Sequence, residues 1–258
     1  MTERTFTSQT AGPVVLGVDV PMGSIYVQVD NAAKYATVAL RTDDSSGKAV
    51  DAIKGAHFGQ VGQALTVQVP ELPGNAMTHT VRDGQVFQSV GTVYGNVTGV
   101  TIVNGQVITG GTTTMEKVSS IRAEVTLPPG SSLAIVSTST DALICGYVEE
   151  VEFRSVSGVL DADGIRRLKA DTTSGYIAAG RVTEKANVRS VSGHVDLGLY
   201  DGHDARLETT SGAITLHATK NASGTLTARS VSGSIGITGG PNVHKDTHTV
   251  TGGHRVSR

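Results

Sequence analysis

The chain contains no tryptophan, only four phenylalanines and a single cysteine in 258 residues. One cysteine excludes an intrachain disulfide framework, and we expect Cys145 to be a small, buried apolar residue. Because large aromatic side chains are so scarce, the core has to be built from Val, Ile, Leu and Ala. Such side chains suit the narrow interior of a fold made of stacked strands.

The chain also lacks an excess of positive charge and long apolar runs. Its formal net charge is −2, so a nucleic-acid partner is not expected. No apolar run is long enough to span a bilayer, so membrane insertion is not expected either. The opening residues 1–5 form no apolar signal region. These features predict a cytoplasmic protein.

A five-residue motif recurs six times in the C-terminal half. The copies are Arg154–Gly158, Asp171–Gly175, Arg189–Gly193, Glu208–Gly212, Arg229–Gly233 and His248–Gly252. Each has a hydroxyl residue at its second and fourth positions, and the glycines are 17, 18, 19, 21 and 19 residues apart. We predict that the glycines are turn residues at a bend or bulge between strands. A weaker copy, Ser137–Asp141, places Asp141 at the glycine position.

Apolar residues alternate on both sides of each motif. They stand two and four residues after the glycine, as at Leu160 and Ala162, and often just before the motif, as at Phe153. A period of two indicates strands with one buried face. Both hydroxyl residues of each motif are then expected to face inward, where they can hydrogen-bond from coil to coil. The residue that opens each motif faces outward.

The outward position alternates in charge along the series. Its occupants are Arg154, Asp171, Arg189, Glu208, Arg229 and His248. If consecutive copies stack as neighbouring strands about 4.8 Å apart, each inner arginine lies next to an acid, and Arg189 lies between two. An exposed ion pair contributes only about 0–1 kcal/mol. We therefore interpret this ion ladder as a device that fixes register, and as a candidate interaction face.

The period of 17–21 residues accommodates two or three short strands and tight turns per coil. We predict an all-β fold, in which residues 128–258 form a β-solenoid whose coils contact only their neighbours. A meandering antiparallel sandwich is the alternative.

Residues 1–127 are predicted to form a β-rich region, either a separate domain or the beginning of one continuous stack. Strands are expected at 14–20, 25–29, 36–40, 65–69 and 121–127. A single helix is expected between Asp43 and Gln60, capped by Asp44 or Ser45, with Val50, Ile53 and Ala56 on one face. The glycine-rich segment 84–111 carries β-branched residues at strand-like intervals, so short strands or irregular coils are expected there.

With these motifs, the chain resembles the bacterial putative-adhesin family of β-strand-repeat domains of unknown function. The resemblance rests on the Ser-Val-Ser-Gly and Thr-Thr-Ser-Gly copies and on the opening segments Gly12–Leu16 and Gly23–Ile25. It covers nearly the whole chain and implies a β-solenoid with no catalytic residues.

Side chains capable of chemistry form no recognisable site. His244, His248 and His254 match no zinc spacing. Asp161 and Asp163 are acids of the type that solenoid carbohydrate enzymes use, as is Asp171, but the motif acids are spread along the stack. Cys145 has no recognisable histidine partner. We expect no catalytic residue, no metal and no cofactor.

Three functions are compatible with this pattern. The first is a structural protein that self-assembles through its open ends into homo-oligomers or filaments. The second is an adhesin-like binding module that holds a protein or glycan partner on the repeat face. The third, and least favoured, is an enzyme that acts on polysaccharide.

Overall fold

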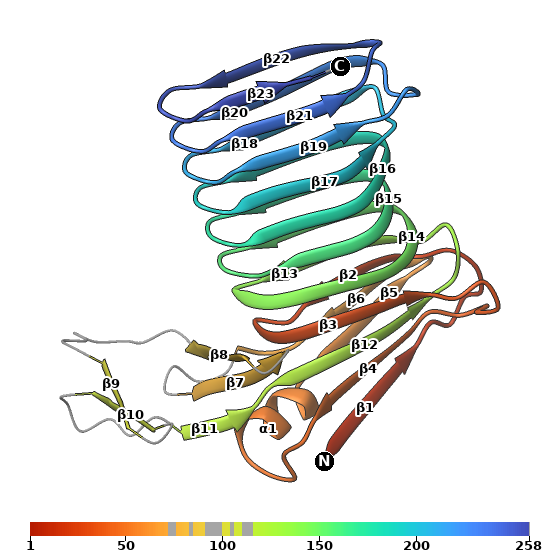
Figure 1. The fold of residues 1–258 in the computed structure, drawn as a ribbon. Helices are drawn as coiled ribbons and strands as arrows, with labels where there is room; N and C mark the ends of the chain where they lie inside the picture. The colour runs from red at the N-terminus through yellow and green to blue at the C-terminus, as the bar shows by residue number, and fades with distance from the viewer. Residues whose placement is uncertain (72–75, 83–84, 91–99, 104–105, 110–115, 258) are drawn as a thin grey trace.

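The repeat region folds as a β-solenoid of about seven turns, as the motif spacing predicts (Figure 1). The computed structural model describes residues 1–71, 76–82, 85–90, 100–103, 106–109 and 116–257. Neighbouring strands of successive coils are parallel throughout residues 132–256. This pairing excludes the antiparallel sandwich for the repeat region.

Each coil contributes one strand segment to each of two sheets that face each other across the core. The front sheet holds the segments that run into the motif. These are β13 (Ser132–Ser137), the second parts of β14 (Ser139–Ser155), β15 (Leu160–Thr172) and β16 (Tyr176–Ser190), then β18 (Asp204–Thr209), β20 (Gly224–Ser230) and β22 (Val243–Thr249).

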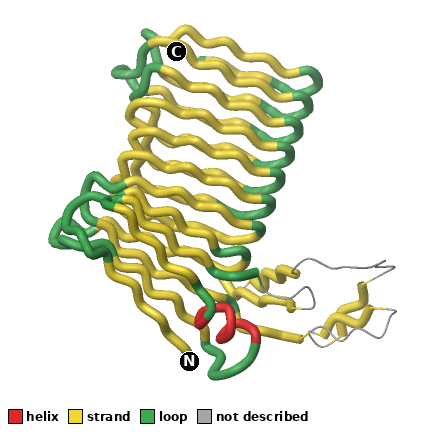
Figure 2. Tube along the Cα trace, turned by 180° about the vertical axis from the view of Figure 1, so that it is seen from behind, coloured by secondary structure: helices red, strands yellow, loops and turns green. Residues whose placement is uncertain are grey.

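The back sheet holds the segments that follow the glycine. These are the first parts of β14, β15 and β16, then β17 (His194–Tyr200), β19 (Ile214–Ala218), β21 (Ile235–Gly239) and β23 (His254–Val256). The turns that contain the motif stack along one edge of the solenoid, drawn in green in Figure 2.

Residues before 128 extend the same two sheets. In the back sheet, β3 (Met22–Val29) lies between β14 and β12 (Ile121–Leu127), followed by β4 (Thr37–Thr42) and β1 (Thr2–Thr7). In the front sheet, β2 (Val15–Asp19) lies between β13 and β6 (Ala64–Gln68), followed by β5 (His57–Val61). One hydrophobic cluster runs from Val14 to Ile237, so both regions share a core.

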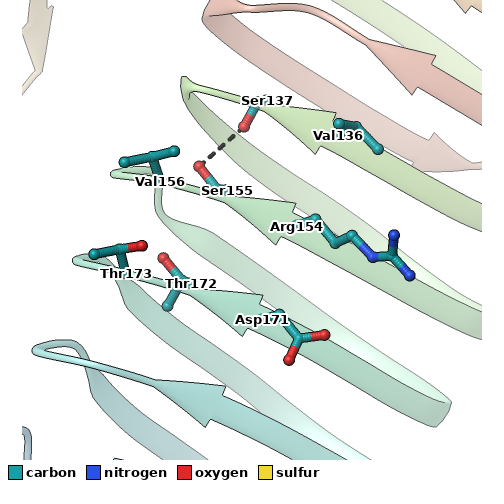
Figure 3. A pocket seen from close by; sticks show the side chains of 8 residues that line it. All are labelled: Val136, Ser137, Arg154, Ser155, Val156, Asp171, Thr172 and Thr173. Carbon is teal, nitrogen blue, oxygen red and sulfur yellow. Dashed lines mark hydrogen bonds between the residues drawn. The ribbon is translucent and has the colours of Figure 1, made fainter. Parts of the chain in front are cut away.

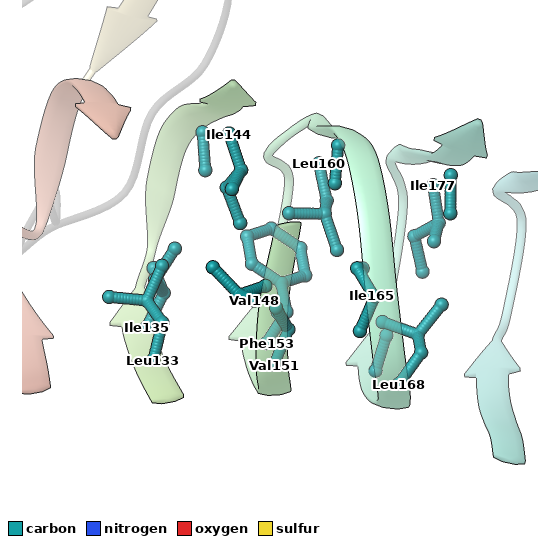
Figure 4. Close-up of a cluster of buried hydrophobic side chains, with 14 of the residues drawn as sticks. Leu133, Ile135, Ile144, Val148, Val151, Phe153, Leu160, Ile165, Leu168 and Ile177 are labelled. Atoms are coloured by element: carbon teal, nitrogen blue, oxygen red, sulfur yellow. The ribbon is translucent and has the colours of Figure 1, made fainter. Parts of the chain in front are cut away.

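The core consists of the aliphatic side chains that the alternation predicts. Phe153 and its equivalents Ala170, Val188, Leu207 and Ala228 are all 0% exposed. Figure 4 shows side chains of both sheets meeting in the core that the coils enclose. Full burial of one such Val, Leu or Phe contributes about 1.5–3 kcal/mol, so every coil adds stability of its own.

The N-terminal end differs from the expectation in three ways. Strands β1 and β5 were not predicted, and β5 occupies residues within the expected helix range. The helix α1 (Lys48–Lys54) begins after Gly47 with no side-chain cap, so the caps Asp44 and Ser45 are wrong. Asp44 instead accepts hydrogen bonds from Ser119 N and Oγ, at 2.9 and 2.7 Å.

Val50 and Ile53 are buried on the helix, as expected, at 1 and 0% exposure. Ala56 is also buried, at 3%, but it lies beyond the end of the helix, so its placement on the helix face is wrong. No helix in the described ranges is long and apolar enough to cross a membrane.

The segment 84–111 contains short strands, as expected where the structure describes it. The strands around it are β7 (Ala76–Arg82), β8 (Gln85–Val90), β9 (Val100–Val103), β10 (Gln106–Thr109) and β11 (Glu116–Ser119). The rest of the prediction, at 84, 91–99, 104–105 and 110–111, lies outside the described residues.

Candidate functional site

The first hydroxyl residue of each motif is buried beside the turn. Ser155, Ser190 and Ser230 are only 8, 8 and 4% exposed, which agrees with the expected inward orientation. The expectation that the hydroxyl before the glycine also faces inward is wrong, because Ser157 and its counterparts are exposed. The strand ends at the first hydroxyl, so the two-residue alternation stops there.

The buried hydroxyls mainly close their own turns. The backbone N–H of Gly193 donates to Ser190 Oγ at 2.7 Å. A direct bond between coils joins Ser137 Oγ to Ser155 Oγ at 3.0 Å (Figure 3). The turn-closing bond recurs from Gly212 to Thr209, Gly233 to Ser230 and Gly252 to Thr249, at 3.0, 2.8 and 3.1 Å. The motif hydroxyl thus satisfies a buried backbone donor.

The motif glycines are required by lack of space. A Cβ built on Gly212 would lie 1.7 Å from the carbonyl oxygen of Gly193, one coil below. The other glycines, Gly158, Gly175, Gly193, Gly233 and Gly252, are equally crowded, with Cβ-to-oxygen distances of 2.2, 2.1, 2.0, 1.8 and 2.0 Å. In the weak copy Thr140, and not Asp141, lies under Gly158, so that alignment was one residue out.

The outward charged residues form one column along the front sheet. Register places Arg154, Asp171, Arg189, Glu208, Arg229 and His248 side by side in that order. The expected ion ladder forms only in part. Within this column of described residues, the single ion pair joins Arg189 Nε to Glu208 Oε2 at 3.4 Å. Arg154 and Arg229 pair with Glu152 and Asp246 of the adjoining column, at 2.6 and 3.4 Å.

Glu208 is the most strongly held acid of the column. Arg206 Nη2 lies 2.7 Å from its Oε1. The hydrogen bond from Arg206 lowers the pKa of Glu208, with a smaller contribution from Arg189 and against the effect of partial burial. This carboxylate therefore stays charged at a lower pH than an ordinary glutamate does.

A groove runs between the charged column and the motif turns. We call it the corner groove. The charged column forms one wall, the residues between the two motif hydroxyls form the other, and the buried hydroxyls form the floor. Two hollows of about 490 and 410 Å³ follow one another along it, the first drawn in Figure 3. On the turn side the hollows are lined by Val156, Thr173, Thr210, Val231 and Val250. Val191 occupies the equivalent position of the motif copy between them.

The front sheet is also hollowed towards the N-terminus. Gly17 and Ala134 leave a depression of about 240 Å³ that is bordered by Asp19, Gln68 and Val136. Register continues the charged column through Val136 to Asp19. Burial raises the pKa of Asp19, against a hydrogen bond from Gln68. No pattern in the sequence indicates this depression, because its small residues come from separate strands.

The remaining candidate residues lie in different parts of the fold. Asp161 and Asp163 lie on back-sheet segments of β15, whereas Asp171 lies on the front sheet, so these three carboxylates do not converge. Cys145 is half-buried, contrary to the expected full burial. In the described part of the chain, no three His, Cys, Asp or Glu side chains form a group that could hold a metal ion.

Comparison with known proteins identifies the family to which the chain belongs. A family model described as Toastrack DUF4097 matches residues 58–255. The chain belongs to this family. The Toastrack match begins in β5 and extends to β23, so it spans both sheets and every motif copy. No curated protein matches the chain.

Solved structures resemble this chain at low sequence identity. A putative adhesin from Bacteroides fragilis NCTC 9343 is 13% identical, with a TM-score of 0.54 over 99% of this chain and 96% of that one. A putative adhesin from Parabacteroides merdae ATCC 43184 is 10% identical, with a TM-score of 0.45 over 99% and 95%. A putative lipid binding protein from Parabacteroides distasonis ATCC 8503 is 14% identical, with a TM-score of 0.41 over 99% and 96%.

Proposed function

We propose that this protein is a non-catalytic, adhesin-like scaffold that binds an elongated polymer or protein partner along the corner groove. The observation that carries the proposal is the repeated, solvent-exposed positive charge on the groove wall. The side chains of Arg154, Arg189 and Arg229 are 57, 56 and 55% exposed. Equivalent groups at regular spacing on a rigid solenoid suit a ligand that itself repeats. The likeness to a protein described as a putative adhesin agrees with this role.

The ends of the solenoid favour this role over end-to-end assembly. Lys245 occupies an inward position of the last front strand, opposite Leu226 of the coil below. Its ammonium donates to the carbonyl oxygens of Gly239 and Ser257. At the other end, Arg4 donates to the carbonyls of Lys54 and Ala56, at 2.6 and 2.7 Å. An inward-pointing charge makes an edge a poor template for a second copy.

Arrays of glycans and of peptides test the proposal. We expect the wild-type protein to bind a subset of elongated ligands, and the variant with Arg154→Ser, Arg189→Ser and Arg229→Ser to lose them while its Tm changes little. The matched control carries Arg166→Ser, Arg167→Ser and Arg181→Ser, which lie outside the corner groove, and should bind as the wild type does. Equal loss in both variants, or retention in both, would sink the proposal.

A further inference from the structure

The corner groove repeats its chemistry every two coils. Coils with arginine in the charged column carry valine on the turn wall, as in Arg154 with Val156 and Arg189 with Val191. The coil between them carries an acid and a threonine, Asp171 with Thr173. Parallel strands lie about 4.8 Å apart, so the full repeat is about 9.6 Å. A ligand that complements every repeat of this groove has to present equivalent side chains at that interval.

A polyproline II peptide has this interval. It contains three residues per turn with a rise of about 3.1 Å each, so it repeats about every 9.3 Å. A β-strand presents like side chains about every 6.6–6.8 Å, and an α-helix about every 5.4 Å. Both fall out of step with the groove after one repeat. From Arg154 to Arg229 the polyproline II helix drifts by only about 0.6 Å.

We propose that the corner groove binds a polyproline II segment with an acidic residue at every third position and a basic residue between successive acids. This inference rests on the proposed function and names its ligand class. Successive acidic side chains pair with Arg154, Arg189 and Arg229, and the basic side chains pair with Asp171 and Glu208. Asp171 forms no ion pair with any described residue, so its charge is free for a ligand.

The apolar wall suits proline rings. Val156, Val191 and Val231 are 51, 51 and 48% exposed, and they recur at the same two-coil interval. A proline in each triplet places one ring against one valine, and burial of these paired apolar surfaces favours binding. Proline also lowers the entropy cost of binding, because it holds the free peptide near the bound conformation.

Fluorescence anisotropy with a labelled peptide of five Glu-Pro-Lys triplets tests the inference. The control peptide has the same composition in an order without a period of three. We expect the triplet peptide to bind at least tenfold more tightly than the control at low salt. Arg189→Ser should weaken binding at least fivefold, whereas Arg181→Ser, an exposed arginine outside the groove, should leave binding unchanged.

Equal binding of both peptides would overturn the inference, because the groove would then recognise the charges of a peptide but not their spacing. If neither peptide binds but an array ligand does so through the three arginines, the polyproline II assignment fails and the proposed function stands. If no ligand depends on those arginines, both fail.

Discussion

Adding a single methyl group to a motif glycine tests the close stacking of the turns. In Gly212→Ala the new Cβ would lie 1.7 Å from the carbonyl oxygen of Gly193, and both are backbone-anchored. Ordinary contact begins near 3.4 Å, so the two coils have to separate locally by well over 1 Å. That shift breaks the bond from Ser211 N to Val191 O, now 2.9 Å, and strains the bond from Gly212 N to Thr209 Oγ1, now 3.0 Å.

The expected loss of stability is about 1–4 kcal/mol. Overpacking typically costs about 1–3 kcal/mol, and each lost hydrogen bond costs about 1 kcal/mol more. Alanine recovers about 0.4–1 kcal/mol by restricting the unfolded chain. Urea unfolding followed by circular dichroism measures the sum. Gly236→Ala is the matched control, because its Cβ would meet nothing closer than Ile214 O at 4.0 Å. Equal stability of the two variants would refute the steric argument.

Three further predictions concern the turn, the C-terminal end and alkaline pH. Ser190→Ala leaves the buried N–H of Gly193 without an acceptor and should cost about 1–3 kcal/mol in urea unfolding, whereas Ser192→Ala at an exposed position should cost under about 0.5 kcal/mol. Lys245→Leu removes the inward charge from the last rung, so sedimentation should detect concentration-dependent association that the wild type lacks; two monodisperse proteins would contradict this. Burial raises the pKa of Tyr200 above its usual value, so above about pH 10 this tyrosine ionises in the unfolded chain before it does in the folded protein. The free energy of unfolding should then fall by up to about 1.4 kcal/mol per pH unit. The fall should be smaller in Tyr200→Phe, and identical pH profiles of the two proteins would argue against this prediction.

The solenoid was predictable because the same physical constraint recurs in every coil. Each coil needs inward apolar groups such as Leu160 and a turn glycine such as Gly193, so the pattern repeats visibly in the sequence. The N-terminal edge strands have no such repetition. Residues 2–7 and 57–61 are only partly buried, and their polar alternation resembles that of a loop. Strand β1 pairs with β4, which lies far along the chain, whereas β5 forms a hairpin with β6 directly after it.

The candidate site was predictable in composition but not in geometry. The sequence indicates the alternating column, because neighbouring coils bring Arg189 and Glu208 together. It does not reveal that two other acids compete for the same arginines: Glu152, two residues before Arg154, and Asp246, on the strand next to Arg229. The fate of the second motif hydroxyl was also hidden. Alternation holds only within a strand, and the strand ends one residue before the turn.

A crystal structure of the complex with the Glu-Pro-Lys peptide tests the central claim most directly. We expect a polyproline II helix along the corner groove, with successive glutamates against Arg154, Arg189 and Arg229. A peptide bound instead in the depression beside Asp19, or paired as a strand along the edge of β22, would contradict it.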